Sequence, residues 1–286
     1  MISLRIGQVD YLNCLPVYHA LEEGILPFAG ELVKGVPTTL NEMFLNGGLE
    51  ITPISSIEYA RHQEKCFILP GLSIAADGPV RSILLFSGRP VPELNGQKIY
   101  TTRSSATSVA LLQILLAHFY RVKAELLPLN SDFLYTDFFA ALAGGGEGVL
   151  LIGDPAMAAH QKALAQDLPV YVTDLGAAWK EFTGKPMIYA LWVVRSAFAL
   201  AHPHQTTRAA RLLWRAKEIG LAGTAEILPK AHRRTGLPIS VIKEYFQTIS
   251  YDFSAEFRAA LLTFYHWASK TGLLKDEVRL RIWGEG

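Results

Sequence analysis

The chain has 286 residues, half of them hydrophobic, and a formal net charge of +1 at pH 7. This size and apolar content suit one large domain or two medium domains, each with its own core. The balanced charge and the absence of a Lys/Arg run argue against nucleic acid as a partner. No apolar segment reaches the roughly 20 residues that span a bilayer. Cys14 and Cys66 are expected to be reduced thiols, with a single disulfide as the alternative.

The first residues, MISLRIGQVDYLN, begin at once with a strand pattern. They contain no basic stretch, no apolar core and no small-residue cleavage site of the kind that directs export. If the chain is complete, we therefore expect a cytoplasmic protein that is not bound to a membrane.

Strand and helix patterns alternate along the N-terminal part of the chain. Expected strands are residues 2–9, 31–36 and 49–54, and expected helices are residues 16–23, 39–45 and 56–61. This order favours a parallel sheet with helices on its faces. The stretch 80–87, VRSILLFS, is a near-continuous apolar strand, and the Pro- and Gly-rich stretch 88–96 is typical of a boundary.

A second strand–helix series follows the boundary, and the C-terminal part is helical. Expected strands are residues 98–101, 124–128, 148–152, 170–173 and 186–195. Expected helices are residues 106–120, 133–142, 204–221, 224–235, 238–247 and 254–271, and a further helix should begin at Asp154. We interpret the apolar strands 80–87 and 186–195 as paired crossovers between two α/β lobes. One lobe would be residues 1–86 with 190–286, and the other residues 87–189. This layout is typical of a hinged binding architecture with its cleft between the lobes.

A run of small hydroxyl residues, Ser104-Ser105-Ala106-Thr107-Ser108, precedes the long apolar helix. The first N–H groups of a helix have no partner within the helix, and the helix dipole adds partial positive charge there. Hydroxyl donors at this end could therefore hold a carboxylate. The alternative is that Ser104 or Ser105 only caps the helix.

Other polar residues follow strands or begin helices, where ligands bind in open α/β sheets. Tyr11 and Asn13 follow the first strand, and the pair Ser55-Ser56 follows the third; a plain polar turn is the alternative for both. Arg81 and Ser82 begin the strand 80–87, where Arg81 could pair with a ligand carboxylate or simply be exposed.

Two further candidates lie in the second half of the chain. Asp154 at a strand end could orient a ligand hydroxyl or act as an acid or base, or it could cap the next helix, with Pro155 in the first turn. Tyr189 could form the floor of a cleft or belong to the core.

No motif for a metal, a nucleophile elbow or a nucleotide occurs in the sequence. The patterns CxxC, HExxH, GxSxG, GxGxxG and GxxxxGK[ST] are all absent. We therefore expect no metal and no cofactor, and spacing alone identifies no general base.

Seven motifs, in order between residue 5 and about residue 195, resemble those of the menaquinone-pathway chorismate dehydratases. They are DYLNCLP, PISSIEYA, GPVRSILLFS, S-x-T-S at 105–108, LLIGDPAM, DLGAAW and YALWVVR. The resemblance is weaker over the C-terminal helices. It implies an α/β fold of two lobes, like that of type II periplasmic binding proteins, with a hinged cleft between the lobes.

The resemblance also implies a lyase that needs no cofactor. Its substrate would be chorismate, a small dicarboxylate, and its product 3-[(1-carboxyvinyl)oxy]benzoate, in the first step of the futalosine route to menaquinone. The ring C3–H of chorismate is vinylogous to the ring carboxylate, so an anion formed there can delocalise, and loss of the C4 hydroxyl gives an aromatic ring. The protein would align these bonds, stabilise the spread charge and close to exclude water.

The resemblance implies two groups of residues that hold the substrate's acidic groups. Ser105, Thr107 and Ser108, with the helix N-terminus, would hold one carboxylate. Ser56 and Ser82, with nearby backbone N–H groups, would hold the other carboxylate or the ether arm.

The remaining roles concern the reacting centre and the cleft. Asn13 is the candidate catalytic residue and would hydrogen-bond the departing C4 hydroxyl. Asp154 and Tyr189 would shape the cleft, and Tyr11 and Arg81 are further substrate-binding candidates. No protein base stands out, so the substrate's enolpyruvyl carboxylate could remove the proton.

Two residues depart from the usual pattern of these dehydratases. Asp10 stands where Ser is common, and because an acid beside the cleft would repel a dicarboxylate, its side chain should point away. Cys14 stands where a small polar residue is common, and no partner base accompanies it that would make it a nucleophile.

Three other functions are consistent with parts of the pattern. A non-catalytic protein that binds small carboxylates would use the same fold and pocket. The sister enzyme, 1,4-dihydroxy-6-naphthoate synthase, usually needs a His near the cleft, whereas His19, His62, His118 and His160 fall on expected helices. A ligand-responsive regulator would need a DNA-binding segment, and none is visible.

Overall fold

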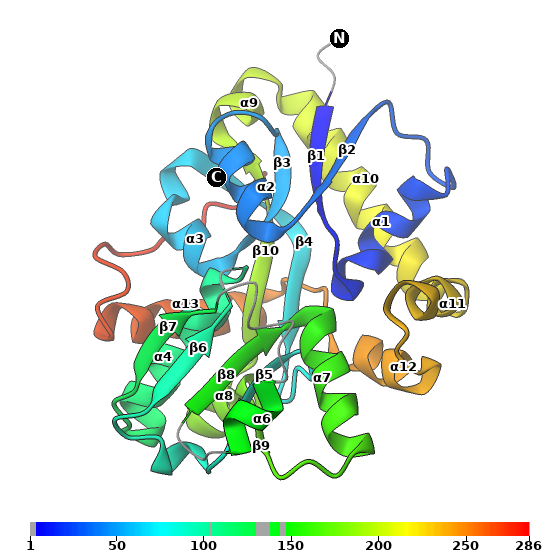
Figure 1. Ribbon diagram of the computed structural model, residues 1–286. Coiled ribbons are helices and arrows are strands. Elements are labelled where there is room, and N and C mark those ends of the chain that lie inside the picture. The colour runs from blue at the N-terminus through cyan, green and yellow to red at the C-terminus, as the bar shows by residue number, and fades with distance from the viewer. Residues whose placement is uncertain (1–3, 103, 130–137, 144–146, 286) are drawn as a thin grey trace.

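The computed structural model describes residues 4–102, 104–129, 138–143 and 147–285, and within them it contains two five-stranded sheets (Figure 1). One sheet lies in the upper half of Figure 1 and the other in the lower half, with helices packed around both. The predicted α/β class is therefore confirmed.

The first sheet has the strand order β2-β1-β3-β10-β4. Its strands are β1 (Leu4–Val9), β2 (Gly30–Gly35), β3 (Ile51–Ser55), β4 (Cys66–Ala76) and β10 (Met187–Arg195). β1 is parallel to β2 and β3, as the alternating pattern predicts, whereas β10 is antiparallel to β3 and β4.

The second sheet has the order β7-β6-β8-β5-β9. Its strands are β5 (Ile83–Ser87), β6 (Lys98–Thr101), β7 (Glu125–Pro128), β8 (Glu147–Ile152) and β9 (Tyr171–Asp174). β6 is parallel to β7 and β8, and β5 is antiparallel to β8 and β9. Each sheet therefore contains one apolar strand, β10 or β5, that is antiparallel to both of its neighbours.

The two apolar strands that we interpret as crossovers belong to different sheets. β5 lies between β8 and β9 in the second sheet, whereas β10 lies between β3 and β4 in the first. A continuous apolar run indicates a strand buried on both faces but does not identify its neighbours. The lobe boundaries at residues 86/87 and 189/190 stay a prediction. The first boundary would fall near the end of β5, which belongs to the same sheet as the strands that follow it.

The sequence analysis missed β4. Pro70 and Gly71 interrupt its pattern, and Gly71 has a φ of +66°. The pairing with β10 is irregular here, because Ser73 lies opposite Leu191 but Ile68 lies opposite Val193. Such interruptions are typical of a bulged strand, and they conceal it from a search for alternating residues.

The helices mostly agree with the expected ranges. They are α1 (Leu15–Glu22), α2 (Pro37–Leu45), α3 (Ser56–Arg61), α4 (Ala106–Ile114), α6 (Phe138–Ala143), α7 (Gly153–Ala165), α8 (Leu175–Thr183), α9 (Ser196–Ala201), α10 (Pro203–Ala222), α11 (Thr224–Thr235), α12 (Ile239–Thr248) and α13 (Ala255–Lys270). The predicted helix 106–120 is divided, because a π-helical segment, Leu115–Tyr120, follows α4. The first part of the helix predicted at 133–142 lies outside the described residues.

One hydrophobic core connects the two sheets. Ile6 of β1 and Leu85 of β5 belong to the same cluster of buried side chains. On β5 the alternate residues Leu84 and Phe86 face a second, smaller cluster with Phe138. The second sheet is therefore covered on both faces, as its apolar strands require.

Two further features concern the surface and the thiols. None of the described helices is long and apolar enough to cross a membrane. Cys14 and Cys66 are both buried and free, as expected for reduced thiols.

Candidate functional site

A cavity lies where the two sheets meet. Polar residues that line it are Tyr11, Asn13, Ser55, Ser82, Ser104, Ser105, Ser108 and Tyr189. They come from the segments after β1 and β6, from the end of β3, from the turn before β5 and from β10. The cavity therefore lies at strand ends and helix starts, where open α/β sheets bind ligands.

Three polar atoms in the lining are buried and have no hydrogen-bond partner among the described residues. They are Asn13 Oδ1, Ser55 Oγ and the Tyr189 hydroxyl. Most buried polar atoms in folded proteins are paired, because an unpaired one loses about 1–3 kcal/mol of solvation. Three such atoms around one cavity indicate a polar ligand.

The hydroxyl run after β6 both caps α4 and lines the cavity. Ser105 is the N-cap residue of α4, and its Oγ accepts a hydrogen bond from the Ser108 backbone N–H at 3.3 Å. The two hydroxyl oxygens lie 2.8 Å apart. Ser104 also lines the cavity, and its hydroxyl lies 2.6 Å from that of Thr102. Capping and ligand binding are thus compatible at this helix end.

Asn13, which follows β1, and Ser82, in the turn before β5, both line the cavity, and Tyr245 of α12 contacts Ser82. The Tyr245 hydroxyl donates a hydrogen bond to Ser82 Oγ at 3.0 Å. Burial raises the pKa of the Tyr245 phenol, and hydrogen bonds with Ser82 and Asn13 offset only part of this rise. The phenol therefore stays protonated at neutral pH.

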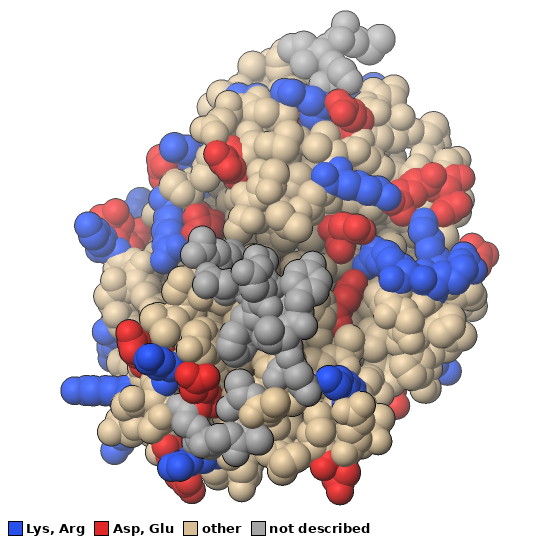
Figure 2. All heavy atoms as spheres, in the orientation of Figure 1, with Lys and Arg blue, Asp and Glu red and all other residues tan. Residues whose placement is uncertain are grey.

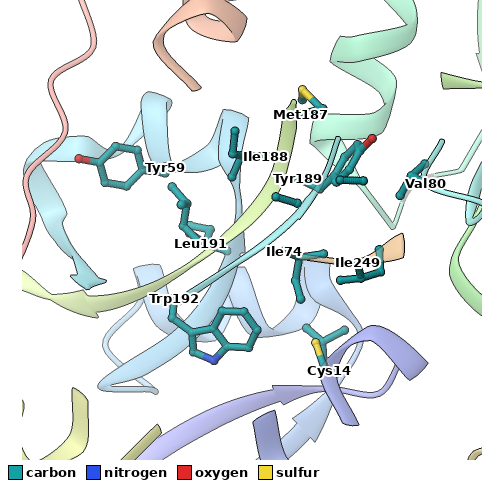
Figure 3. Packing of buried hydrophobic residues seen from close by; sticks show 14 of the residues in the cluster. Cys14, Tyr59, Ile74, Val80, Met187, Ile188, Tyr189, Leu191, Trp192 and Ile249 are labelled. Carbon is teal, nitrogen blue, oxygen red and sulfur yellow. The ribbon is translucent and has the colours of Figure 1, made fainter. Parts of the chain in front are cut away.

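Tyr189 extends from β10 toward the start of α8. Figure 3 shows its ring near Val80, and both residues line the cavity together with Ile74 and Ile249. A Cβ at Gly176 would lie 2.7 Å from the Tyr189 hydroxyl, so glycine leaves room for the phenol. Burial raises the pKa of Tyr189 well above its usual range, and Asp174 raises it further. Tyr189 is thus a neutral hydroxyl at the cavity wall.

Four of the predicted substrate-binding residues do not line the cavity. The Ser56 hydroxyl donates to Ile188 O at 2.7 Å, and Thr107 Oγ1 accepts from the Ile57 N–H at 3.1 Å. Arg81 pairs with Glu244 at 2.9 Å on the outside of the molecule. The fourth, Asp154, accepts from the Leu12 N–H at 3.1 Å. The described contacts of these side chains connect parts of the protein to one another.

Asp10 is exposed and does not line the cavity. Arg234 of α11 contacts Asp10 at 3.0 Å and Asp154 at 3.1 Å, so it bridges the end of β1 and the start of α7. Figure 2 shows Lys and Arg side chains gathered beside Asp and Glu where α1 and α11 lie. Burial raises the pKa of Asp154, and contacts with Leu12 and Arg234 offset part of the rise.

Cys14 lines the cavity, but its thiol is not activated. Burial raises its pKa to about 12, and only Arg234 opposes this rise. The reactive form of cysteine is the thiolate. Cys14 is therefore a small apolar wall residue at neutral pH.

A family model described as menaquinone biosynthesis matches residues 4–270. A chorismate dehydratase from Thermus thermophilus is 30% identical over 277 residues, which cover 91% of this chain and 93% of the relative. This chain belongs to the menaquinone biosynthesis family. A 1,4-dihydroxy-6-naphtoate synthase, also from Thermus thermophilus, is 26% identical over 228 residues, 72% of this chain and 77% of that protein.

The two-lobe prediction is confirmed by solved structures. The periplasmic aliphatic sulphonate binding protein of Escherichia coli superposes with a TM-score of 0.67 at 17% identity, covering 98% of this chain and 97% of that chain. At this identity the likeness concerns the fold alone.

The structure adds three residues that the sequence does not single out for substrate binding. Ser55 rather than Ser56 faces the cavity, because α3 begins at Ser56 and turns that side chain toward β10. Ser104 is the first residue of the hydroxyl run, and the argument for a carboxylate at this helix end applies to it as well. Tyr245 lies on an ordinary amphipathic helix, and no local signal in the sequence identifies it.

Proposed function

We propose that this protein is a chorismate dehydratase, a lyase that removes water from chorismate to give 3-[(1-carboxyvinyl)oxy]benzoate. The observation that carries the proposal is the cavity between the sheets, where the start of α4 and three unpaired polar atoms surround one space. The family and the 30% identical relative support the same reaction. The futalosine route and a cytoplasmic location belong to this proposal.

The two acidic groups of chorismate would bind on different sides of the cavity. Ser105, Ser108 and the N-terminal N–H groups of α4 would hold one carboxylate, because this helix end combines free donors with a favourable dipole. Ser82 and Ser55 would donate hydrogen bonds to the other carboxylate or the ether oxygen. Asn13 Oδ1 would accept a hydrogen bond from the C4 hydroxyl and so hold that group in place at the reacting carbon.

The elimination breaks two bonds and uses no external oxidant. The C3 proton leaves to a base, and its electron pair spreads over the ring toward the ring carboxylate. The C4–O bond then breaks, the oxygen takes up a proton to leave as water, and the ring becomes aromatic. Donors already aimed at the substrate stabilise the spread charge without rearranging.

The base is proposed to be the enolpyruvyl carboxylate of the substrate. Among the described lining residues the ionisable groups are Tyr11, Cys14 and Tyr189, and burial raises the pKa of each. All three are therefore protonated at neutral pH and poorly suited to remove a proton. The substrate carboxylate is tied to C3 through the ether oxygen, so it lies near the proton that it would take.

The sister synthase is a weaker candidate. No histidine occurs among the described residues that line the cavity, whereas that reaction is expected to need one. Simple binding without turnover is the other alternative, and it predicts unchanged chorismate.

Chorismate deuterated at ring C3 tests the proposed reaction. The product should be free of deuterium, and its formation should show a primary isotope effect if proton removal limits the rate. A dehydration product that keeps the deuterium would show that a different C–H bond breaks and would contradict the mechanism.

A further inference from the structure

Tyr245 does not itself line the cavity and is distant in sequence from the polar residues that do, yet its hydroxyl contacts Ser82, which is one of them. The Tyr245 side chain is buried, with a relative exposure of 1%. The hydroxyl donates to Ser82 Oγ at 3.0 Å, from α12 to the turn before β5. A helix of the C-terminal part thus contacts the site directly.

The direction of this hydrogen bond determines what Ser82 can do. A serine hydroxyl has one proton to donate and two lone pairs that accept. Because Tyr245 donates to Ser82 Oγ, the serine proton is left for another acceptor, and no described residue takes it up. Ser82 lines the cavity, so a substrate oxygen is the acceptor within reach.

We propose that Tyr245 is a positioning residue that keeps the Ser82 proton directed into the cavity, toward a substrate carboxylate that gains charge during the elimination. This proposal rests on the proposed dehydration of chorismate. A phenol that donates to an alcohol also polarises it and strengthens the hydrogen bond that the alcohol gives in turn. A donor fixed in this way needs no reorientation when charge develops on the substrate.

Asn13 lies near the same phenol, and its Oδ1 is buried and unpaired among the described residues. The measured hydrogen bond of Tyr245 is the one to Ser82, so the proposed positioning concerns Ser82.

Tyr251 supplies a matched control. Its side chain is also buried, with 3% exposure, and its hydroxyl has no partner among the described residues. Tyr251→Phe removes a buried hydroxyl from the same region without touching Ser82. Tyr245→Phe removes the hydroxyl that contacts Ser82, so a difference between the two variants reports that contact.

Steady-state kinetics of Tyr245→Phe, Tyr251→Phe, Ser82→Ala and the double variant Tyr245→Phe/Ser82→Ala test the proposal. In Tyr245→Phe, kcat should fall about 10- to 100-fold with KM changed less than about threefold, since a transition-state donor is misaligned. Tyr251→Phe should keep both constants within about threefold. The double variant should be less than about threefold slower than Ser82→Ala alone, because Tyr245 is proposed to act mainly through Ser82. The proposal would be overturned if Tyr245→Phe and Tyr251→Phe had equal kcat. It would also be overturned if the loss of kcat in the double variant equalled the product of the losses in the two single variants.

A crystal structure of Tyr245→Phe shows the orientation of the Ser82 side chain directly, without an activity measurement. The Ser82 hydroxyl should rotate to a new acceptor, whereas an unchanged Ser82 side chain would contradict the positioning role. If the wild-type protein leaves chorismate unchanged, the proposed function fails, and this structure still decides whether Tyr245 positions Ser82.

Discussion

The Thr107 hydroxyl, in the first turn of α4, accepts a 3.1 Å hydrogen bond from the backbone N–H of Ile57, in the first turn of α3. The two helices follow strands of different sheets, and both residues are fully buried. This hydrogen bond therefore connects the two halves of the structure beside the cavity. It also gives Thr107 a structural role that competes with the predicted role in substrate binding.

Thr107→Val should destabilise the protein and affect binding little. Valine has a similar shape but leaves the Ile57 N–H unpaired, at a loss of about 1–3 kcal/mol. Urea unfolding measures this loss, with Thr263→Val as the control, because the Thr263 hydroxyl donates to Ala259 O within α13. A stable variant whose KM for chorismate rises tenfold would instead assign Thr107 to the substrate.

Ser108→Ala should weaken substrate binding. If Ser108 donates to a bound carboxylate, its loss removes a hydrogen bond to a charged group, and KM should rise about tenfold or more with kcat little changed. Ser254→Ala is the control, because Ser254 precedes α13 and makes no capping hydrogen bond with its side chain. An unchanged KM in Ser108→Ala would show that the residue serves α4 alone.

Glu22 should make the protein sensitive to acid. Burial would raise its pKa, but hydrogen bonds from Lys34, Lys230 and Gln8 outweigh burial and lower the pKa to about 2. The unfolded value is 4.5, so the stabilisation is present above about pH 4.5 and is lost as the pH falls toward 2. The shift corresponds to on the order of 3 kcal/mol.

Urea unfolding between pH 7 and pH 3 measures this effect. The wild-type protein should lose more stability over this range than Glu22→Gln, because the variant lacks the titrating group. Exposed Glu277, for which the described residues show no ion pair, supplies Glu277→Gln as the control. Parallel pH profiles for the wild type and Glu22→Gln would disprove the role of Glu22.

Cys14 should prove unreactive and dispensable. Its pKa of about 12 means that almost no thiolate exists at pH 8, and the side chain is buried. Iodoacetamide should label neither Cys14 nor Cys66 in the native protein and both in urea. Cys14→Ala should keep kcat within about tenfold, whereas loss of a covalent nucleophile lowers it on the order of a millionfold.

Several of the predicted residues line the cavity because they follow a local rule. Tyr11, Asn13, Ser82 and Ser105 lie at strand ends or helix starts, and those positions can be found from hydrophobic patterns alone. The choice of Ser56 over Ser55 failed because it depended on where α3 begins, to within one residue. Tyr245 could not be found, because only the packing of α12 against the turn before β5 brings it to the cavity.

Mass spectrometry of chorismate incubated with the purified protein and with Asn13→Ala tests the central claim most directly. The wild-type protein should yield a product lighter than chorismate by one water, and the variant should form it far more slowly while still binding chorismate. Chorismate left unchanged by the wild-type protein, or converted equally fast by Asn13→Ala, would contradict the proposed site and its reaction.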